Sequence, residues 1–278
     1  MSITPSQAPI VSGDKPKAYT YKTLNDINLT GPIRVLVFGP AKTGKTEFLL
    51  TWPKPVIADY DGEGVKVAAN PGFISRHGRI DFRYQEFRDP IDPKTGIFSK
   101  ATAFLDSIQW LNSVINDDWA ETVGFDSLTS LSVAAHNAGL VASGKRNRSK
   151  ALEYAKLDGV LLKGQQDFGA EMGAIEQLLD QLMAVKGKNV VVIAHERDET
   201  TDSGIVLRRS PLITGARLRA QIAKWFDEVW HFDVRSDGQR VLTCQPKGVL
   251  KDVGTRLGMP AEILNPTYSK VIAALGGK

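Results

Sequence analysis

The chain has 278 residues, of which 42% are hydrophobic and 24% are charged, and these are ordinary values for a soluble globular protein. This length suits one large domain or two small ones, and the lack of any run of 18 apolar residues excludes a membrane-spanning helix. The formal net charge of +4 permits nucleic-acid binding but does not by itself indicate it.

The first 30 residues are polar and rich in proline, so we expect a flexible arm over residues 1–30. Such an arm either has no function or docks on a neighbouring subunit. Its sequence lacks the basic and apolar regions of a signal peptide. Cys244 is the only cysteine, which excludes a disulfide within the chain and fits a reducing compartment. We therefore expect a cytoplasmic protein without a membrane partner.

A glycine-rich motif follows the first predicted strand, Ile33–Phe38. The motif is Gly39-Pro40-Ala41-Lys42-Thr43-Gly44-Lys45-Thr46, which matches GxxxxGK[ST]. The helix that begins at Glu47 completes a strand–loop–helix frame typical of a phosphate-binding loop. In such a loop the backbone N–H groups converge and the helix adds the positive end of its dipole. Lys45 can reach the β- and γ-phosphates and Thr46 can bind Mg²⁺, so we assign residues 39–47 to ATP binding.

Two further predicted strands end in carboxylates. Residues 56–58 run into Asp59-Tyr60-Asp61-Gly62-Glu63, and carboxylates at the carboxyl end of a strand in an open α/β sheet lie at the rim where ligands bind. The third strand, residues 122–127, carries Asp126 near its end in the manner of a Walker B motif. In that motif the acid holds Mg²⁺, usually through water, while the hydroxyl of the phosphate-binding loop ligates the ion directly.

The segments on either side of the third strand are predicted from helical spacing and charge. The weak alternation of residues 80–87 indicates an extra strand. Ser99 is a suitable N-cap for a helix that ends near Asn116. Five apolar residues are expected on the packing face of this helix: Phe104, Leu105, Ile108, Leu111 and Ile115. Residues 134–166 look irregular. Their basic cluster is either a solvated surface loop or a loop that contacts phosphates; it comprises Lys145, Arg146, Arg148 and Lys150.

The second half of the chain continues the alternation of helices and strands. An amphipathic helix over Phe168–Val185 precedes Asn189–Glu196, the most β-branched run, which is expected to be a central strand covered on both faces. His195 and Glu196 emerge at its carboxyl end, either as a hydrogen-bonded polar pair or as a sensor of the γ-phosphate or the attacking water.

The remaining elements are a loop, a helix and two strands. Residues 198–214 are predicted to be a polar loop that carries Arg208 and Arg209. A helix closes at residues 222–226. A fifth strand over residues 227–232 is then followed by a turn and an antiparallel return over residues 241–244.

The order of these elements resembles the RecA-like branch of the phosphate-loop NTPases, and most closely the small phage-encoded RecA-like ATPases that support single-strand annealing. Four stretches carry the resemblance: Val37–Leu50, Val56–Gly64, Val123–Leu128 and Val190–Glu196. The resemblance implies one α/β domain over residues 31–278, with five parallel strands, antiparallel additions and helices on both faces of the sheet. It also implies a Mg²⁺-dependent ATPase that forms a homo-oligomeric ring or filament and acts on single-stranded DNA in phage recombination or strand annealing.

The position of the catalytic base separates two branches of these NTPases. Motors of the AAA+ type usually place a glutamate directly after the Walker B acid, whereas Ser127 follows Asp126 here. RecA-like proteins take the base from an Asp-x-Glu arrangement just past strand two. Asp61 stands at the matching position and is one methylene shorter, and Glu63 lies two residues further on. The resemblance therefore implies that Asp61 or Glu63 orients the attacking water, with Lys45, Asp126 and His195 completing the catalytic set.

Two loops contact DNA in RecA-like proteins, and the resemblance assigns them to residues 143–166 and 197–215. The implied DNA-binding residues are the basic ones: Lys145, Arg146, Arg148, Lys150, Arg208 and Arg209. In these proteins a basic residue from a neighbouring subunit also completes the nucleotide site. Three late basic residues are candidates for that role, unless they are solvated surface charges: Lys247, Lys251 and Arg256.

Three other functions stay open. An AAA+-type motor or helicase loader is disfavoured by the missing glutamate. A small-molecule phosphotransferase would need an arginine-rich lid, for which Arg208 and Arg209 are the only candidates, and no acceptor-site signature accompanies them. A nucleotide-binding assembly protein without DNA-stimulated turnover is the third. Fold alone does not separate these functions.

Overall fold

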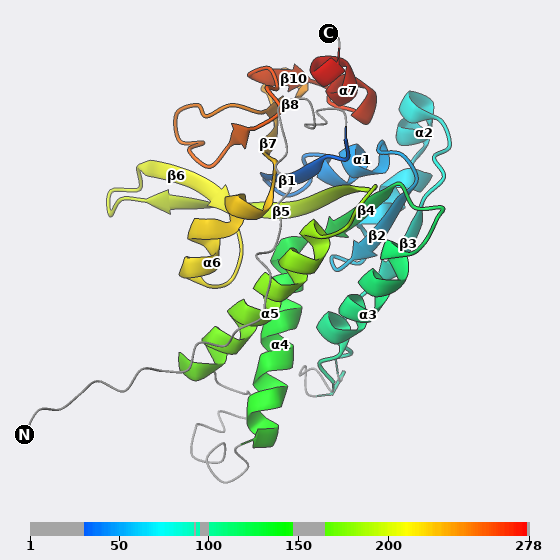
Figure 1. Cartoon of the computed structure of the whole chain (residues 1–278). Coiled ribbons are helices and arrows are strands. Elements are labelled where there is room, and N and C mark those ends of the chain that lie inside the picture. The colour runs from blue at the N-terminus through cyan, green and yellow to red at the C-terminus, as the bar shows by residue number, and fades with distance from the viewer. Residues whose placement is uncertain (1–30, 92, 95–99, 147–164, 277–278) are drawn as a thin grey trace, which may run out of the picture.

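A mostly parallel β-sheet lies at the centre of the structure, a computed structural model that describes residues 31–91, 93–94, 100–146 and 165–276. Figure 1 shows this sheet with helices on both of its faces. The predicted arm over residues 1–30 lies outside the described residues. None of the helices within the described ranges has the length and apolar character needed to cross a membrane.

Ten strands make up the sheet in this part of the chain: β1 (Arg34–Gly39), β2 (Pro55–Asp59), β3 (Arg83–Glu86), β4 (Thr122–Asp126), β5 (Asn189–Thr200), β6 (Val206–Pro211), β7 (Glu228–Val234), β8 (Arg240–Thr243), β9 (Gly254–Thr255) and β10 (Glu262–Leu264). Their order is β10-β8-β7-β1-β5-β4-β2-β3, with β6 paired to β5 and β9 to β7. Six neighbouring strands, from β7 to β3, are parallel, and the others are antiparallel additions. The predicted RecA-like α/β fold class is confirmed, with β3 as a sixth parallel strand.

Helices cover the sheet in two layers. The described helices are α1 (Lys45–Leu50), α2 (Pro71–His77), α3 (Ala103–Ile115), α4 (Leu128–Arg146), α5 (Gln165–Met183), α6 (Ala216–Gln221) and α7 (Tyr268–Gly276), with 3₁₀ turns η2 (Gly64–Ala69) and η3 (Ile222–Trp225). Helices α3, α4 and α5 lie on one face, and α1, α2 and α7 lie on the other (Figure 1).

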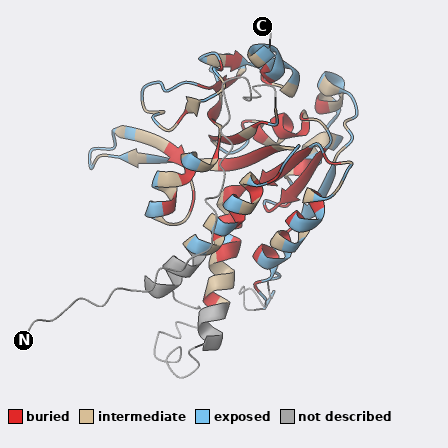
Figure 2. Ribbon diagram, in the orientation of Figure 1, coloured by how far each residue is buried: buried red, intermediate tan, exposed pale blue. Residues whose placement is uncertain are grey.

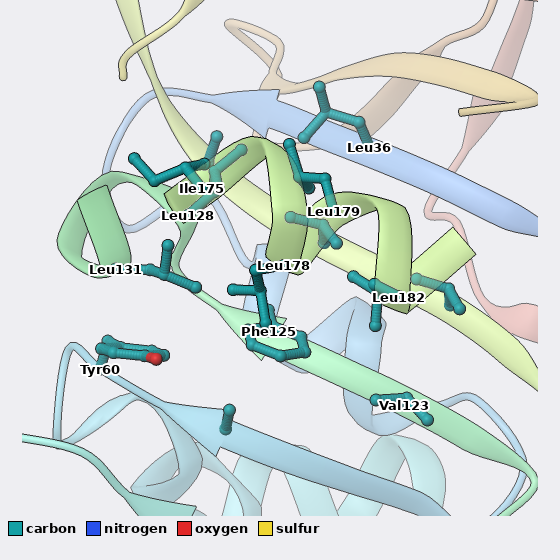
Figure 3. Close-up of a cluster of buried hydrophobic side chains, with 14 of the residues drawn as sticks. Leu36, Tyr60, Val123, Phe125, Leu128, Leu131, Ile175, Leu178, Leu179 and Leu182 are labelled. Atoms are coloured by element: carbon teal, nitrogen blue, oxygen red, sulfur yellow. The ribbon is translucent and has the colours of Figure 1, made fainter. Parts of the chain in front are cut away.

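The alternation of side chains along β1 explains why its sequence is continuously apolar. Leu36 and Phe38 belong to the core beneath α3, α4 and α5, whereas Val35 and Val37 belong to the core beneath α1. A strand with helices on both faces buries its side chains, and Figure 2 shows the central strands buried where helices cover both faces of the sheet. Figure 3 shows the first of these cores, in which leucines of α4 and α5 pack over Val123 and Phe125 of β4.

Several local predictions were wrong. Residues 128–146, partly predicted as irregular, form helix α4. The predicted polar loop over residues 198–214 is instead the β5–β6 hairpin, and β5 continues to Thr200. The predicted helix from Ser99 begins at Ala103, and Leu105 is 54% exposed instead of packed. The hairpin strands are mostly polar, which hides the apolar alternation by which a strand is recognised in a sequence.

Both edges of the sheet are short. All four residues of β3 are exposed, and Arg83 there forms an ion pair with Asp117 and lies over the Trp119 ring. At the other edge β10 has three residues. Its Glu262 pairs with Arg235 and Lys247.

Candidate active site

The glycine-rich loop joins β1 to α1 at the carboxyl end of the parallel strands. A Cβ on Gly39 would lie 2.0 Å from the carbonyl oxygen of Phe232 on β7, so only glycine fits the start of this loop. Gly44 has a φ of +108°, which glycine adopts without strain. Thr43 donates its hydroxyl to the carbonyl of Pro40 at 3.0 Å and thereby closes the loop.

Lys45 is folded back onto this loop. Its Nζ donates to the carbonyl oxygens of Gly39 at 2.9 Å and Pro40 at 2.5 Å. Burial lowers the pKa of Lys45, while the carboxylates of Asp126, Glu196 and Asp61 oppose that shift. The ammonium group is therefore held at the loop by weak carbonyl acceptors, which the more strongly charged oxygens of a phosphate can replace.

Thr46 and Asp126 meet across the top of the sheet. The Thr46 hydroxyl donates to Oδ2 of Asp126 at 2.5 Å. Gly64 packs over this pair, since a Cβ there would lie 2.9 Å from the same carboxylate oxygen. Burial raises the pKa of Asp126 to about 7; the carboxylates of Asp61 and Asp59 add to this rise, whereas Thr46 and Lys45 oppose it.

These residues fit a magnesium ion and a nucleotide. Thr46 and Asp126 offer a hydroxyl and a carboxylate oxygen, the donors that Mg²⁺ prefers. Asp59 ends β2 beside Asp126 in the sheet. Its Oδ2 is buried without a hydrogen-bond partner in the described part of the chain, and burial raises the pKa of this carboxyl group. No cluster of three or more His, Cys, Asp or Glu residues forms a protein-only metal site among the residues described.

Asp61 lies in a network of hydrogen bonds just past β2. Its Oδ1 accepts from the hydroxyls of Ser127, at 3.0 Å, and Ser130, and its Oδ2 lies 3.3 Å from Nε2 of His195. Burial alone would raise the pKa of Asp61, but the hydrogen bonds from His195, Ser130 and Ser127 outweigh it and the pKa is lowered. Asp61 is therefore an ionised acceptor at neutral pH, and its side chain is 27% exposed.

Glu63 has a different environment from Asp61. Its side chain is 71% exposed and pairs with Lys66, one turn along η2, at 2.6 Å. The hydrogen bond from Lys66 lowers the pKa of Glu63. Of the two candidate bases, only Asp61 lies in the network with His195.

His195 and Glu196 emerge together at the point where β5 leaves the parallel sheet. The backbone N–H of His195 donates to the Thr129 hydroxyl at 3.0 Å, which ties the strand to α4. Glu196 accepts from the buried His231 at 2.7 Å, and its negative charge acts on Lys45. The two side chains thus point to different parts of the site, His195 to Asp61 and Glu196 to His231 of β7.

Glu47, assigned to nucleotide binding, has its side chain in an ion-pair cluster. The carboxylate is 3% exposed and accepts from Arg76 at 3.0 Å, His77 at 2.9 Å and Arg240 at 2.5 Å. Burial opposes ionisation, but the hydrogen bonds from Arg240, His77 and Arg76 hold the pKa of Glu47 at about 2. Any contact of Glu47 with phosphate is therefore left to its backbone N–H.

The predicted DNA-binding arginines are paired with acids. Arg208 forms a two-point ion pair with Asp252. Arg209 binds Asp198 at 2.7 Å, and Glu196 lies 3.7 Å away. These pairs neutralise the charge that the sequence assigned to DNA. Of the other cluster, Lys145 and Arg146 belong to the end of α4, and Arg148 and Lys150 lie outside the described residues.

The three candidates for a residue that acts on a neighbouring subunit follow β8. Lys247 pairs with Glu262 at 3.1 Å, and Arg256 lies 3.4 Å from Asp227. Lys251 is exposed. All three are on the surface, and their role at a subunit boundary stays a prediction.

Two residues of the site, Ser130 and Arg240, were not predicted from the sequence. Ser130 lies one turn after Asp126 on α4, so its spacing from the Walker B acid is a usable signal. Arg240 reaches the glycine-rich loop from β8, and nothing in the local sequence indicates that contact.

A family model described as an AAA domain matches residues 31–250. Among solved structures, the chain is similar to one titled as a prototypical ATPase from the type III secretion system of pathogenic bacteria, with 12% identity and a TM-score of 0.43. That match covers 74% of this chain and 53% of the other, so this chain corresponds to about half of that protein. No curated protein is detectably similar in sequence.

The raised pKa of Asp126 predicts a pH-dependent stability. The folded protein keeps a proton on Asp126 that the unfolded chain releases between about pH 4 and pH 7, so the free energy of unfolding falls as the pH rises through that window. We expect Asp126→Asn to gain roughly 2–3 kcal/mol over wild type between pH 5 and pH 8, at about 1.4 kcal/mol per pKa unit. Denaturant unfolding without Mg²⁺ or nucleotide measures this, and an equal difference at both pH values would contradict it.

Proposed function

Because the chain belongs to the AAA-domain family and is a P-loop ATPase, we propose that it hydrolyses ATP with Mg²⁺ and that Asp61 orients the attacking water. The network around Asp61 carries this proposal. An ionised carboxylate held by Ser127, Ser130 and His195 keeps a fixed orientation and stays ready to accept a proton or polarise a water.

The other residues of the site have separate tasks. Lys45 binds the β- and γ-phosphates, and Thr46 and Asp126 hold the metal. When bound, Mg²⁺ supplies positive charge that neutralises the phosphate oxygens. His195 pairs with Asp61 and so couples the orientation of that carboxylate to the point where β5 leaves the parallel sheet.

The two candidate carboxylates give a matched test of this mechanism. We expect Asp61→Asn to retain ATP affinity and lose about 10²-fold or more in kcat, because the water loses its acceptor. Glu63→Gln makes the same carboxylate-to-amide change at an exposed side chain and should hydrolyse ATP normally. Single-turnover hydrolysis and equilibrium ATP binding measure both effects, with Lys45→Ala as the binding-deficient control. Normal turnover by Asp61→Asn would overturn the assignment.

We also propose that the ATPase acts on single-stranded DNA in recombination or strand annealing, as the sequence resemblance implies. Support comes from the basic run over residues 145–150, which contains no acid. The ion pairs of Arg208 and Arg209 weaken the support from the second loop. They favour, as a second candidate, a nucleotide-binding assembly protein whose turnover does not respond to DNA.

DNA binding should depend steeply on salt if it runs through the residue 145–150 cluster. Replacing Lys145, Arg146, Arg148 and Lys150 by Ser should reduce the slope of log K against log salt by roughly 2–3, since each single-strand phosphate contact contributes about 0.7. A double Arg208→Ser, Arg209→Ser variant should change it less, because those charges are already paired. Binding titrations and DNA-stimulated ATPase assays measure this. A wild-type protein that ignores single-stranded DNA at low salt would favour the second candidate.

The AAA-domain match also keeps an AAA-type motor or loader as an alternative. Ser127 occupies the position at which such motors carry a glutamate, and its hydroxyl instead donates to Asp61. This contact is the reason for preferring the RecA-like mechanism.

We further propose a homo-oligomer in which a basic residue completes the neighbour's nucleotide site. Lys251 is the preferred candidate, because Lys247 and Arg256 already have acidic partners. Lys251→Ala should lower kcat by about 10³-fold and be partly rescued by mixing with Lys45→Ala subunits, whereas the exposed Lys186→Ala should behave as wild type. ATPase activity per subunit should also rise with protein concentration. Light scattering that shows a fully active monomer with ATP and DNA would contradict the assembly.

A further inference from the structure

Arg240, at the start of β8, lies against the glycine-rich loop. A Cβ built on Gly44 would lie 2.8 Å from both Cζ and Nε of Arg240, and 3.2 Å from its Nη2. The missing side chain at Gly44 therefore leaves the space that the guanidinium occupies. The Nε–Nη2 edge of Arg240 faces the loop at the residue just before Lys45.

Two sets of contacts fix Arg240 in this position. Its Nη1 donates to the buried Glu47 carboxylate at 2.5 Å. The backbone N–H of Arg240 donates to the side-chain oxygen of Asn265 at 3.2 Å, and the backbone carbonyl of Arg240 accepts from the backbone N–H of Asn265 at 2.7 Å. The ion pair uses one end of the guanidinium, and the side chain is still 31% exposed. Glu47 thus works as an anchor that holds the other edge of Arg240 on the loop.

The charges around Glu47 are unbalanced. Arg76 and Arg240 share this one carboxylate, and the ammonium of Lys45 lies two residues away with carbonyl oxygens as its acceptors. The converging N–H groups of a phosphate-binding loop add further positive potential. An anion placed at the loop would therefore meet a cation that is already oriented, at little cost in ordering.

The sheet order shows which part of the nucleotide Arg240 approaches. β8 lies on one side of β1, beyond β7, whereas Asp61 follows β2 on the other side, beyond β5 and β4. Asp61 is the carboxylate proposed for hydrolysis at the γ-phosphate. Arg240 therefore comes to the loop from the opposite end of the site, where the phosphates nearer the sugar would lie.

We propose that Arg240 forms a cationic subsite for the α- and β-phosphates, the part of the nucleotide that ATP and ADP share. The proposal rests on the proposed function, since it assumes that the loop binds ATP. Arg240 is then a binding residue for substrate and product alike, and its loss weakens affinity without removing the hydrolytic groups.

Isothermal titration with MgATP and with ADP tests the proposal. Arg240→Ala should weaken both ligands by a similar factor, roughly 10- to 100-fold, the range for one charge-assisted hydrogen bond. Arg240→Lys should lose less, because it keeps the charge. The matched control is Arg76→Ala, which removes the other guanidinium from Glu47 without touching Gly44 and should change either affinity by less than about threefold. Single-turnover hydrolysis at saturating ATP should be close to wild type in the Arg76→Ala control.

Each outcome is decisive. Unchanged affinity of Arg240→Ala for ATP and ADP would overturn the proposal, and so would equal losses in Arg240→Ala and Arg76→Ala, because both would then act through Glu47. Should Arg240→Ala fail to fold, Arg240→Gln keeps the bulk and removes the charge, and the same affinity loss is expected. A wild-type protein that binds no ATP, or a Lys45→Ala variant that binds it normally, would instead refute the proposed function.

Discussion

The hydrogen bond from Thr46 to Asp126 is the contact on which the site depends. It joins the loop after β1 to the end of β4, although β5 lies between these strands in the sheet. Parallel strands make this possible, because all their carboxyl ends lie along one edge and the loops that leave them converge there. Gly64 then packs on the same pair, so the segment that carries Asp61 is positioned by it as well.

The site is assembled with more negative than positive charge at its centre. The charge of Asp61 raises the pKa of Asp59 and of Asp126, Asp59 also raises that of Asp126, and Lys45 is the buried cation among them. Asp61 stays ionised through its hydroxyl and imidazole donors, whereas Asp126, with one hydroxyl donor, is the carboxylate whose pKa rises most clearly. A divalent cation held by Thr46 and Asp126 would add positive charge here, and it would have to displace the proton that burial keeps on Asp126.

The sequence predicted the parallel core well, because that core depends on local patterns. The apolar run of Ile33–Phe38, the loop after it and the acid at Asp126 are each recognisable within a few residues. The hairpin over β5 and β6 was missed because residues 196–200 and most of β6 are polar and pair with one another beyond the parallel part of the sheet. The sequence also did not predict that Asp61 and Glu63 have different surroundings. The side chains that contact Asp61, those of Ser130 and His195, come from 69 and 134 positions further along the chain. Arg240 was missed for the same reason: its contact with Gly44 is set by strand order and not by spacing.

The short, charged edges of the sheet limit how copies of this protein can join. At one edge β3 exposes Arg83, Gln85 and Glu86 to solvent, and at the other β10 spans three residues with Glu262 held in ion pairs. Edges of this kind resist the addition of a foreign strand. A ring or filament of this chain would therefore be held by side-chain contacts, and not by a continuous sheet that runs from one subunit into the next.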